Sequence, residues 1–213
     1  METKQRIIKI IAILKKEYPD TSTILNHRNP FQLLVATVLS AQCTDKRVNM
    51  VTPKLFKKYK SVKAFAGAQQ SELEEDIRAI GFFRNKAKNI IGFSKLLLEK
   101  FHSKVPDTMD ELLELPGAAR KTANIILTQV FGKAEGIAVD THVARISQKL
   151  KLTKNKDPKK IEYDLLNIIP KKDWLHFNSY LVNHGRAICV ARRPKCGECK
   201  IARYCPSRAT LVL

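Results

Sequence analysis

The sequence predicts an all-α protein. Apolar residues recur at the three- and four-residue spacing of amphipathic helices through most of the chain. The two-residue alternation of a half-buried strand is not seen, and 8 glycines and 9 prolines leave little room for a turn-rich β fold. In order, the expected helices cover residues 2–18, 31–40, 45–59, 71–80, 84–101, 109–115, 118–131, 141–150, 159–168 and 172–185.

Residues that start and stop helices support the first half of this assignment. The helix at 2–18 has isoleucine or leucine at positions 7, 8, 10, 11 and 14, and Pro19 ends it. Asn29 and Pro30 open the next helix, which is almost wholly apolar and is expected at the centre of a core. The helix at 71–80 starts with Ser71 and Glu74, a capping-box pattern, and Gly81 ends it. The helix at 84–101 has an apolar stripe of alanine, isoleucine and leucine.

The helices at 109–115 and 118–131 are joined so tightly that they form a hairpin. Pro116 stops the first helix, and Gly117 permits a turn with positive φ. The first N–H groups of the second helix have no partner within it and point outward, so this is a place to hold a phosphate. Lys121 lies in the first turn, where the helix dipole disfavours a cation, and an uncharged lysine is a nucleophile.

The charge balance points to an anionic partner. The chain of 213 residues contains 39 Lys and Arg against 20 Asp and Glu, a formal net charge of +19. Nucleic acid is the usual partner for such an excess, whereas a lysine-rich proteome is the simpler alternative. No stretch is long and apolar enough to span a membrane, and the N-terminus does not resemble a signal peptide. We expect a cytoplasmic protein, associated with the nucleoid if it is prokaryotic, and a monomer.

Four of the five cysteines form the strongest chemical pattern, Cys189-x6-Cys196-x2-Cys199-x5-Cys205. Four thiolates within 17 residues can surround one metal centre, and the spacing alone fits iron–sulfur or zinc equally well. Nearby basic residues are expected to keep these thiolates deprotonated: Arg186, Arg192, Arg193, Lys195, Lys200 and Arg203. The remaining Cys43 is expected to be a small buried residue.

The hairpin segment LPGAARKTA resembles LPGVGRKTA of the endonuclease III family of DNA base-excision glycosylases. It departs from that pattern at Ala118 and Ala119. If position 119 needs a positive φ, alanine costs roughly 1 kcal/mol. If it lies in the first helical turn, alanine fits, and we favour this interpretation. The cysteine tail, with Pro194 before its second cysteine, is similar to the family's four-iron, four-sulfur tail, which implies a 4Fe-4S cluster on Cys189, Cys196, Cys199 and Cys205.

The same resemblance implies the catalytic pair. The segment VDTHV contains Asp140, which by itself reads as the N-cap of the helix at 141–150. In the family this segment carries the catalytic aspartate, and one carboxylate can do both tasks. Lys121 matches the lysine with which bifunctional members form a Schiff base. His142 is expected to be structural.

Further matches concern DNA contacts. LSAQCTD is similar to the family's LLSAQxTD segment, whose glutamine enters the gap left by a flipped nucleotide, here Gln42. IGFFRNKA is similar to VGLYNSKA, whose apolar wedge maps to Phe82. Without the family, Gln42 reads as a polar residue between helices and Phe82 as core. Gly117 and Arg120 of the hairpin are also expected at DNA.

We therefore expect two helical lobes, 22–132 with the hairpin and 1–21 plus 133–213 with the cluster tail. The expected function is a base-excision repair enzyme that removes damaged, oxidised pyrimidines and cleaves the abasic site by β-elimination, acting on double-stranded DNA. Two alternatives remain open. One is a monofunctional adenine or mismatch glycosylase, and the other is a non-catalytic DNA-binding iron–sulfur protein.

Overall fold

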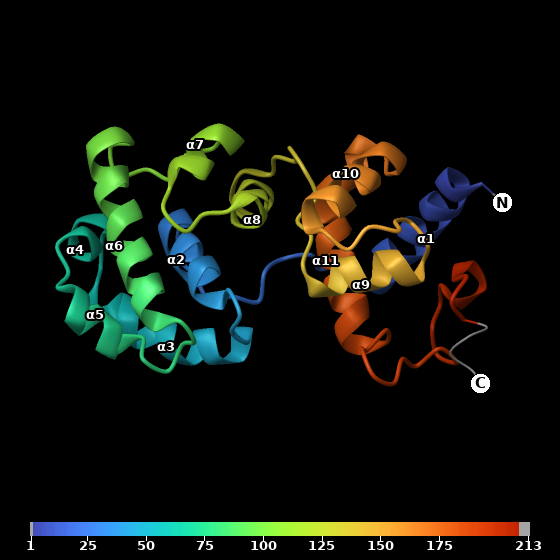
Figure 1. Ribbon diagram of the computed structural model, residues 1–213, viewed down its shortest axis with the longest axis horizontal. Coiled ribbons are helices and arrows are strands. Elements are labelled where there is room, and N and C mark those ends of the chain that lie inside the picture. Colours follow the sequence, from blue (N-terminus) through green and yellow to red (C-terminus); the bar gives the residue numbers. More distant parts are fainter. Residues whose placement is uncertain (1, 209–213) are drawn as a thin grey trace. The chain divides into compact units, whose positions relative to one another are not determined.

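The computed structural model describes residues 2–208, and these residues contain helices and no β-strand (Figure 1). The predicted all-α class is therefore confirmed. The α-helices are α1 (Thr3–Glu17), α2 (Pro30–Ser40), α3 (Asp45–Lys58), α4 (Val62–Ala66), α5 (Gln70–Asp76), α6 (Phe83–Lys100), α7 (Met109–Glu114), α8 (Arg120–Phe131), α9 (Thr141–Lys149), α10 (Pro158–Ile168) and α11 (Trp174–Ala187). Two short 3₁₀ segments are η1 (Lys171–Asp173) and η2 (Ala202–Tyr204).

The chain divides into two compact units. The first unit is Ile24–Phe131, and the second joins Met1–Thr23 to Gly132–Leu213. The ranges expected from the sequence were 22–132 and 1–21 with 133–213. Each unit has its own hydrophobic core, in which the apolar faces of its helices are buried.

The first unit is built around α2, whose apolar run is buried as expected. Leu33, Leu34 and Leu39 are 0% exposed, and α2 packs against α3, α6 and α8. Helix α6 runs beside α4 and α5, which is visible in Figure 1. Helices α7 and α8 pack against each other as the predicted hairpin. Cys43 is half-buried against this core, rather than fully buried.

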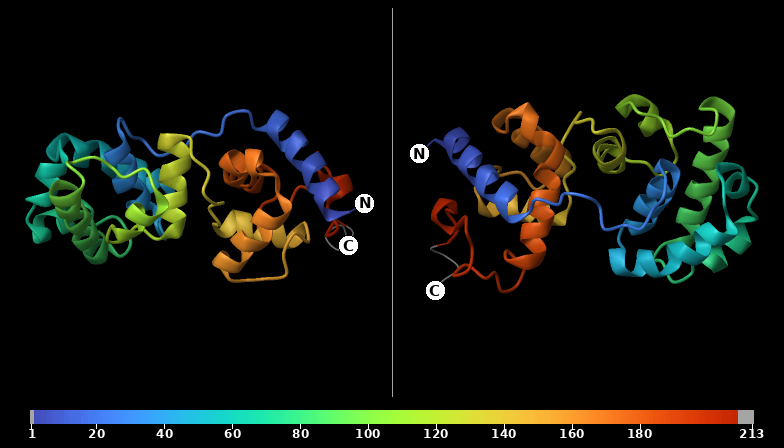
Figure 2. Two further views of the ribbon diagram at one scale, coloured as in Figure 1. Left: turned by 90° about the horizontal axis from the view of Figure 1, so that it is seen from above. Right: turned by 180° about the vertical axis from the view of Figure 1, so that it is seen from behind.

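The second unit packs α9 and α1 against α11, and α10 against α1. Phe177 on α11 is 0% exposed at its centre. The N-terminal helix and the cysteine-rich tail lie side by side in both views of Figure 2. Arg6 joins them, because its Nη1 donates to the Leu150 carbonyl at 2.6 Å and to the Tyr204 carbonyl at 3.2 Å.

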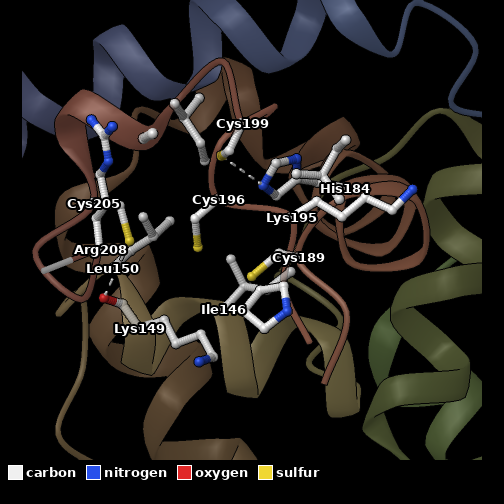
Figure 3. Close-up of a pocket in the computed structure, with 14 residues that line it drawn as sticks. Ile146, Lys149, Leu150, His184, Cys189, Lys195, Cys196, Cys199, Cys205 and Arg208 are labelled. Carbon is white, nitrogen blue, oxygen red and sulfur yellow. Dashed lines mark hydrogen bonds between the residues drawn. The ribbon is translucent and has the colours of Figure 1, made fainter. Parts of the chain in front are cut away.

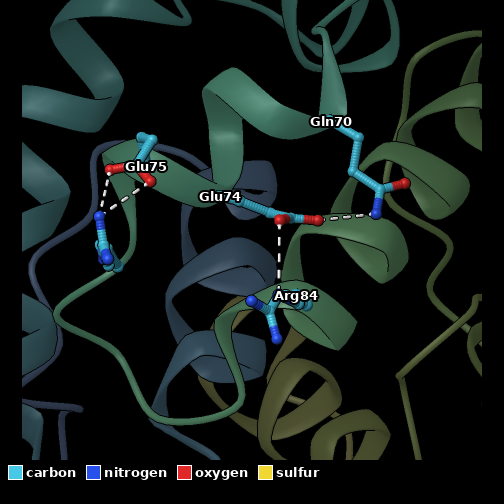
Figure 4. Close-up of polar contacts among 5 residues, drawn as sticks. Gln70, Glu74, Glu75 and Arg84 are labelled. Carbon is cyan, nitrogen blue, oxygen red and sulfur yellow. Dashed lines mark hydrogen bonds and ion pairs between the residues drawn. The ribbon is translucent and has the colours of Figure 1, made fainter.

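One local expectation was wrong, and one helix was not predicted. The unpredicted helix is α4, which has only five residues, too few to show a period in the sequence. The capping box at Ser71 does not form, because α5 begins at Gln70 and has no side-chain cap. Glu74 instead accepts a hydrogen bond from Gln70 Nε2 at 2.8 Å, and its other oxygen lies 4.0 Å from Arg84 Nε of α6 (Figure 4). The glutamate thus joins two helices rather than capping one.

Candidate functional site

The hairpin turn depends on Gly117. The Ala118 N–H donates to the Leu115 carbonyl at 3.0 Å, and Gly117 has a φ of 79°. A Cβ at Gly117 would lie 2.6 Å from Asn89 Nδ2 and 3.0 Å from Asn89 Cβ, so a side chain there meets both backbone strain and a steric clash. The turn residue identified from the sequence is thus required by the geometry.

Ala119 lies one residue before α8, and its carbonyl accepts from the Ala123 N–H at 3.0 Å. It is not among the described residues that have positive φ. Alanine therefore fits this position without backbone strain, although α8 begins at Arg120, two residues later than expected. The departure from the family's second glycine leaves the hairpin intact.

Lys121 is the second residue of α8, and its side chain is exposed. The neighbouring Arg120 is half-buried, and Ala118 in the turn is buried. The amine is therefore presented at the start of the helix, next to the outward-pointing backbone N–H groups.

Asp140 begins α9 in the second unit. Its Oδ1 accepts a hydrogen bond from the Val143 N–H at 2.8 Å, which confirms the N-cap. The carboxylate is half-buried, and the cap uses only one of its two oxygens. Because Oδ1 forms the N-cap, Oδ2 remains available for a role in the reaction.

The segment before Asp140 is held by residues that the sequence did not reveal. The Ile137 N–H donates to Glu162 Oε1 at 3.2 Å, and Asn178 Nδ2 donates to the Ala138 carbonyl at 2.8 Å. His142 packs tightly against Gly185, where an added Cβ would lie 2.5 Å from the ring. These contacts fix the entry into α9, and with it the position of the carboxylate.

Gln42 and Phe82 lie at exposed turns of the first unit. Their φ angles are 52° and 58°, both in the left-handed region. Phe82 is 64% exposed, so the interpretation of this residue as core is wrong. Gln42 is exposed as well. A large apolar side chain left in solvent at a strained turn is a candidate contact surface.

The four tail cysteines line one pocket with about 420 Å³ of empty space, part of it open to solvent (Figure 3). Each of these cysteines is half-buried. The rest of the pocket comes mainly from α9, α11 and the tail itself: Ile146, Lys149, Leu150, His184, Ile188, Pro194, Lys195, Ile201, Ala202 and Arg208. Within residues 2–208, no group of three metal-ligating side chains is already drawn together. Four thiols around one hollow nevertheless fit the donor set of an iron–sulfur cluster.

The basic groups that act on these thiols differ from those expected. Burial raises the pKa of Cys189 and Cys199. For Cys189 the opposing cations are Arg145 and Lys149 of α9, and Arg145 Nη1 donates to both the carbonyl and the sulfur of Cys189. These two residues are 44 and 40 positions away in sequence, so a local reading of the tail does not find them. Loss of the thiol protons would accompany metal binding.

His184 contacts the tail from α11. Its Nδ1 lies 3.1 Å from the Tyr18 hydroxyl, and its Nε2 lies 3.7 Å from Cys199 Sγ. Burial lowers the pKa of His184 to about 4, with a further contribution from Arg145. The ring is therefore neutral near pH 7, so one of its two nitrogens donates a hydrogen bond and the other accepts one.

Comparison with known proteins shows the family to which this fold belongs. Residues 35–171 match the HhH-GPD superfamily of base excision DNA repair proteins, and residues 189–205 match the iron–sulfur binding domain of endonuclease III. The endonuclease III of Synechocystis is 54% identical over 96% of this chain and 93% of its own, and that of Escherichia coli is 37% identical over 95% of each. A structure of a trapped endonuclease III–DNA covalent intermediate superposes with a TM-score of 0.93, at 42% identity over 100% of both chains.

The chain belongs to the HhH-GPD superfamily of base excision DNA repair proteins. Within it, the chain is a member of the endonuclease III family, with that family's iron–sulfur binding domain. It is an enzyme, a bifunctional DNA glycosylase and abasic-site lyase, and the expected iron–sulfur cofactor is confirmed. The monofunctional and non-catalytic alternatives are set aside. No helix among the described residues is long and apolar enough to cross a membrane.

Proposed function

We propose that the enzyme acts on double-stranded DNA that contains oxidised pyrimidines or abasic sites, with Lys121 as the nucleophile and Asp140 as its partner carboxylate. The observation that carries this proposal is the position of Lys121, an exposed amine in the first turn of α8 at the hairpin. A covalent complex with DNA has been trapped for a relative that is 42% identical over the full chain. An amine at a helix start that attracts phosphate is suited to form such a bond.

In the proposed reaction, the damaged nucleotide leaves the stack, because the chemistry cannot reach a base inside a duplex. The Lys121 amine attacks the sugar C1′ as the bond from C1′ to the base breaks, and the base departs with a proton. Asp140 stabilises the developing positive charge on the sugar and accepts protons. The bond from C1′ to the ring oxygen O4′ then breaks as O4′ takes a proton, which opens the sugar ring and leaves a protonated Schiff base between Lys121 and C1′. A proton then leaves C2′, and the bond from C3′ to its phosphate oxygen breaks. Water releases the sugar and restores the amine.

The remaining DNA contacts are assigned by the same proposal. The backbone at Gly117 and the side chain of Arg120 contact phosphates at the hairpin. Gln42 fills the gap that the flipped nucleotide leaves, and Phe82 wedges the opposite strand. The two lobes expected from the sequence, 22–132 and 1–21 with 133–213, are the proposed domains of the enzyme. The enzyme works as a monomer in the cytoplasm.

Cys189, Cys196, Cys199 and Cys205 are the proposed ligands of a 4Fe-4S cluster. When bound, the cluster supplies four iron–sulfur bonds that fix the tail, and no catalytic step is assigned to it. The loop after Cys189 is closed by the Lys195 N–H, which donates to the Ile188 carbonyl at 2.9 Å. Arg192 and Arg193 on this loop are exposed and are positioned to meet DNA backbone.

Borohydride trapping tests the proposal. A duplex with one oxidised pyrimidine is incubated with enzyme and borohydride, and the covalent adduct is counted on a denaturing gel. The natural enzyme is expected to form the adduct and to nick the strand without added alkali, whereas Lys121→Gln is expected to do neither. Lys88→Gln, a change at an exposed lysine on α6, serves as the matched control and is expected to trap normally. Normal trapping by Lys121→Gln would overturn the assignment.

A further inference from the structure

Lys86 is a buried lysine in the first turns of α6, and its residue is only 5% exposed. Its Nζ donates to the Leu39 carbonyl at 2.9 Å and to the Ala41 carbonyl at 2.6 Å. Among the described residues it forms no ion pair with a carboxylate. Burial lowers the pKa of Lys86, since the ammonium loses water. Burial of a cation without a carboxylate partner costs free energy, so we expect this lysine to have a specific role.

The two carbonyls belong to the C-terminal end of α2, where backbone oxygens have no partner within the helix. A cation is favoured at that end of a helix dipole. Lys86 therefore satisfies the end of α2 from a different helix, 45 to 47 residues further along the chain. The next residue after Ala41 is Gln42, so the ammonium lies directly behind the turn that presents this glutamine.

The backbone of the same lysine holds the second turn. The Lys86 N–H donates to the Phe82 carbonyl at 3.1 Å. One residue thus links both exposed turns: its main chain binds Phe82, and its side chain binds the residue before Gln42. The turns lie close together, since a Cβ on Gly81 would be 3.6 Å from the Gln42 carbonyl oxygen. Arg47 adds a second tie, because its Nη1 donates to the Ala79 carbonyl at 3.2 Å.

Both turns have left-handed backbone at a residue other than glycine, which persists only where surrounding contacts hold it. We propose that Lys86 is a positioning residue that fixes the Gln42 turn and the Phe82 turn relative to each other, so that both side chains enter DNA as one unit. This inference rests on the proposed function of Gln42 and Phe82. A glutamine that fills a gap in one strand and a phenylalanine that wedges the other must keep a set separation.

The test is a comparison of Lys86→Met in two backgrounds, the natural enzyme and the Gln42→Ala/Phe82→Ala double variant. The measurement is fluorescence anisotropy with a duplex that contains a tetrahydrofuran abasic-site analogue and with the same duplex undamaged. In the natural background, Lys86→Met is expected to weaken binding to the lesion duplex about tenfold, the equivalent of one lost anchoring contact. In the double-variant background, Lys86→Met is expected to weaken binding to the lesion duplex by less than about twofold, because its effect acts through the two turns.

The controls separate positioning from folding and from charge. Lys95→Met removes an exposed lysine from the same helix and is expected to leave the ratio of lesion to undamaged affinity unchanged. Borohydride trapping on single-stranded abasic DNA needs no wedge, and Lys86→Met is expected to trap there at the natural level. If Lys86→Met does not fold, Lys86→Gln keeps one donor at this site and is expected to lower the same affinity ratio by a smaller factor.

Each outcome decides one claim. An equal loss from Lys86→Met in both backgrounds, or no loss in the natural one, overturns the positioning role while the insertion roles of Gln42 and Phe82 stand. If Gln42→Ala and Phe82→Ala leave the affinity for the lesion duplex unchanged, the proposed insertion of these two side chains into DNA is wrong, and the positioning role that rests on it is overturned as well. A loss confined to the natural background, with normal single-stranded trapping, supports the inference.

Discussion

Asp140 has two tasks that can be separated by substitution. Its Oδ1 caps α9 through a hydrogen bond of 2.8 Å from the Val143 N–H. Asparagine retains an oxygen that caps a helix almost equally well, but it carries no charge. Asp140→Asn is therefore expected to change the free energy of unfolding by no more than about a few tenths of a kcal/mol, because one good capping residue replaces another. Its turnover on lesion duplex is expected to fall by about 10² to 10³, the scale of one lost electrostatic contact to a transition state.

Asp140→Ala provides the contrast, because it removes both the cap and the charge. Loss of the cap costs about 1 kcal/mol. For a protein of this length the expected drop in Tm is about 2–4 °C. Differential scanning calorimetry gives the stabilities, and single-turnover strand nicking gives the rates. An Asp140→Asn enzyme that is as active as the natural one, or as unstable as Asp140→Ala, would refute the separation of the two roles.

Three further predictions follow from the hairpin, the tail and the charge. Gly117→Ala is expected to destabilise the protein by about 1–3 kcal/mol, since it combines a φ of 79° with the clash at Asn89, and Asn89→Ala should recover only the steric part in thermal melts. Cys205→Ser is expected to abolish the visible absorbance of the purified protein, whereas Cys43→Ser leaves it, and an unchanged spectrum for Cys205→Ser would remove that ligand. With a net charge of +19, affinity for undamaged duplex is expected to fall about 10³-fold between ~50 and ~200 mM salt, and a loss below about threefold would exclude phosphate contacts as its main source.

The features predicted well from the sequence are those that short stretches of chain determine. Asp140 caps α9 because an aspartate directly before a helix has a local partner three residues on. Gly117 could be identified because it follows Pro116 between two helices, and its positive φ favours glycine. The cysteine pattern is complete within 17 residues, so a metal centre could be predicted without a fold, and the family resemblance then indicated iron–sulfur rather than zinc.

The features that could not be predicted join distant parts of the chain. Arg145 reaches Cys189 across 44 residues, and His184 reaches Tyr18 across 166. Lys86 resembles any helical lysine in the sequence, and only the folded chain brings its Nζ to the end of α2. Ser71 and Glu74 show the opposite failure: the local pattern was present, but α5 starts one residue earlier and Glu74 pairs with Arg84 instead. Tertiary contacts overrode the local preference.

The most direct test of the central claim is the site of the covalent bond to DNA. Enzyme trapped with borohydride on an abasic duplex is digested with protease and nuclease, and the adduct is located by tandem mass spectrometry. The sugar remnant is predicted on the Nζ of Lys121, in the peptide that begins α8. A remnant on another lysine, or on the N-terminal amine, would contradict the account of how this enzyme cleaves DNA.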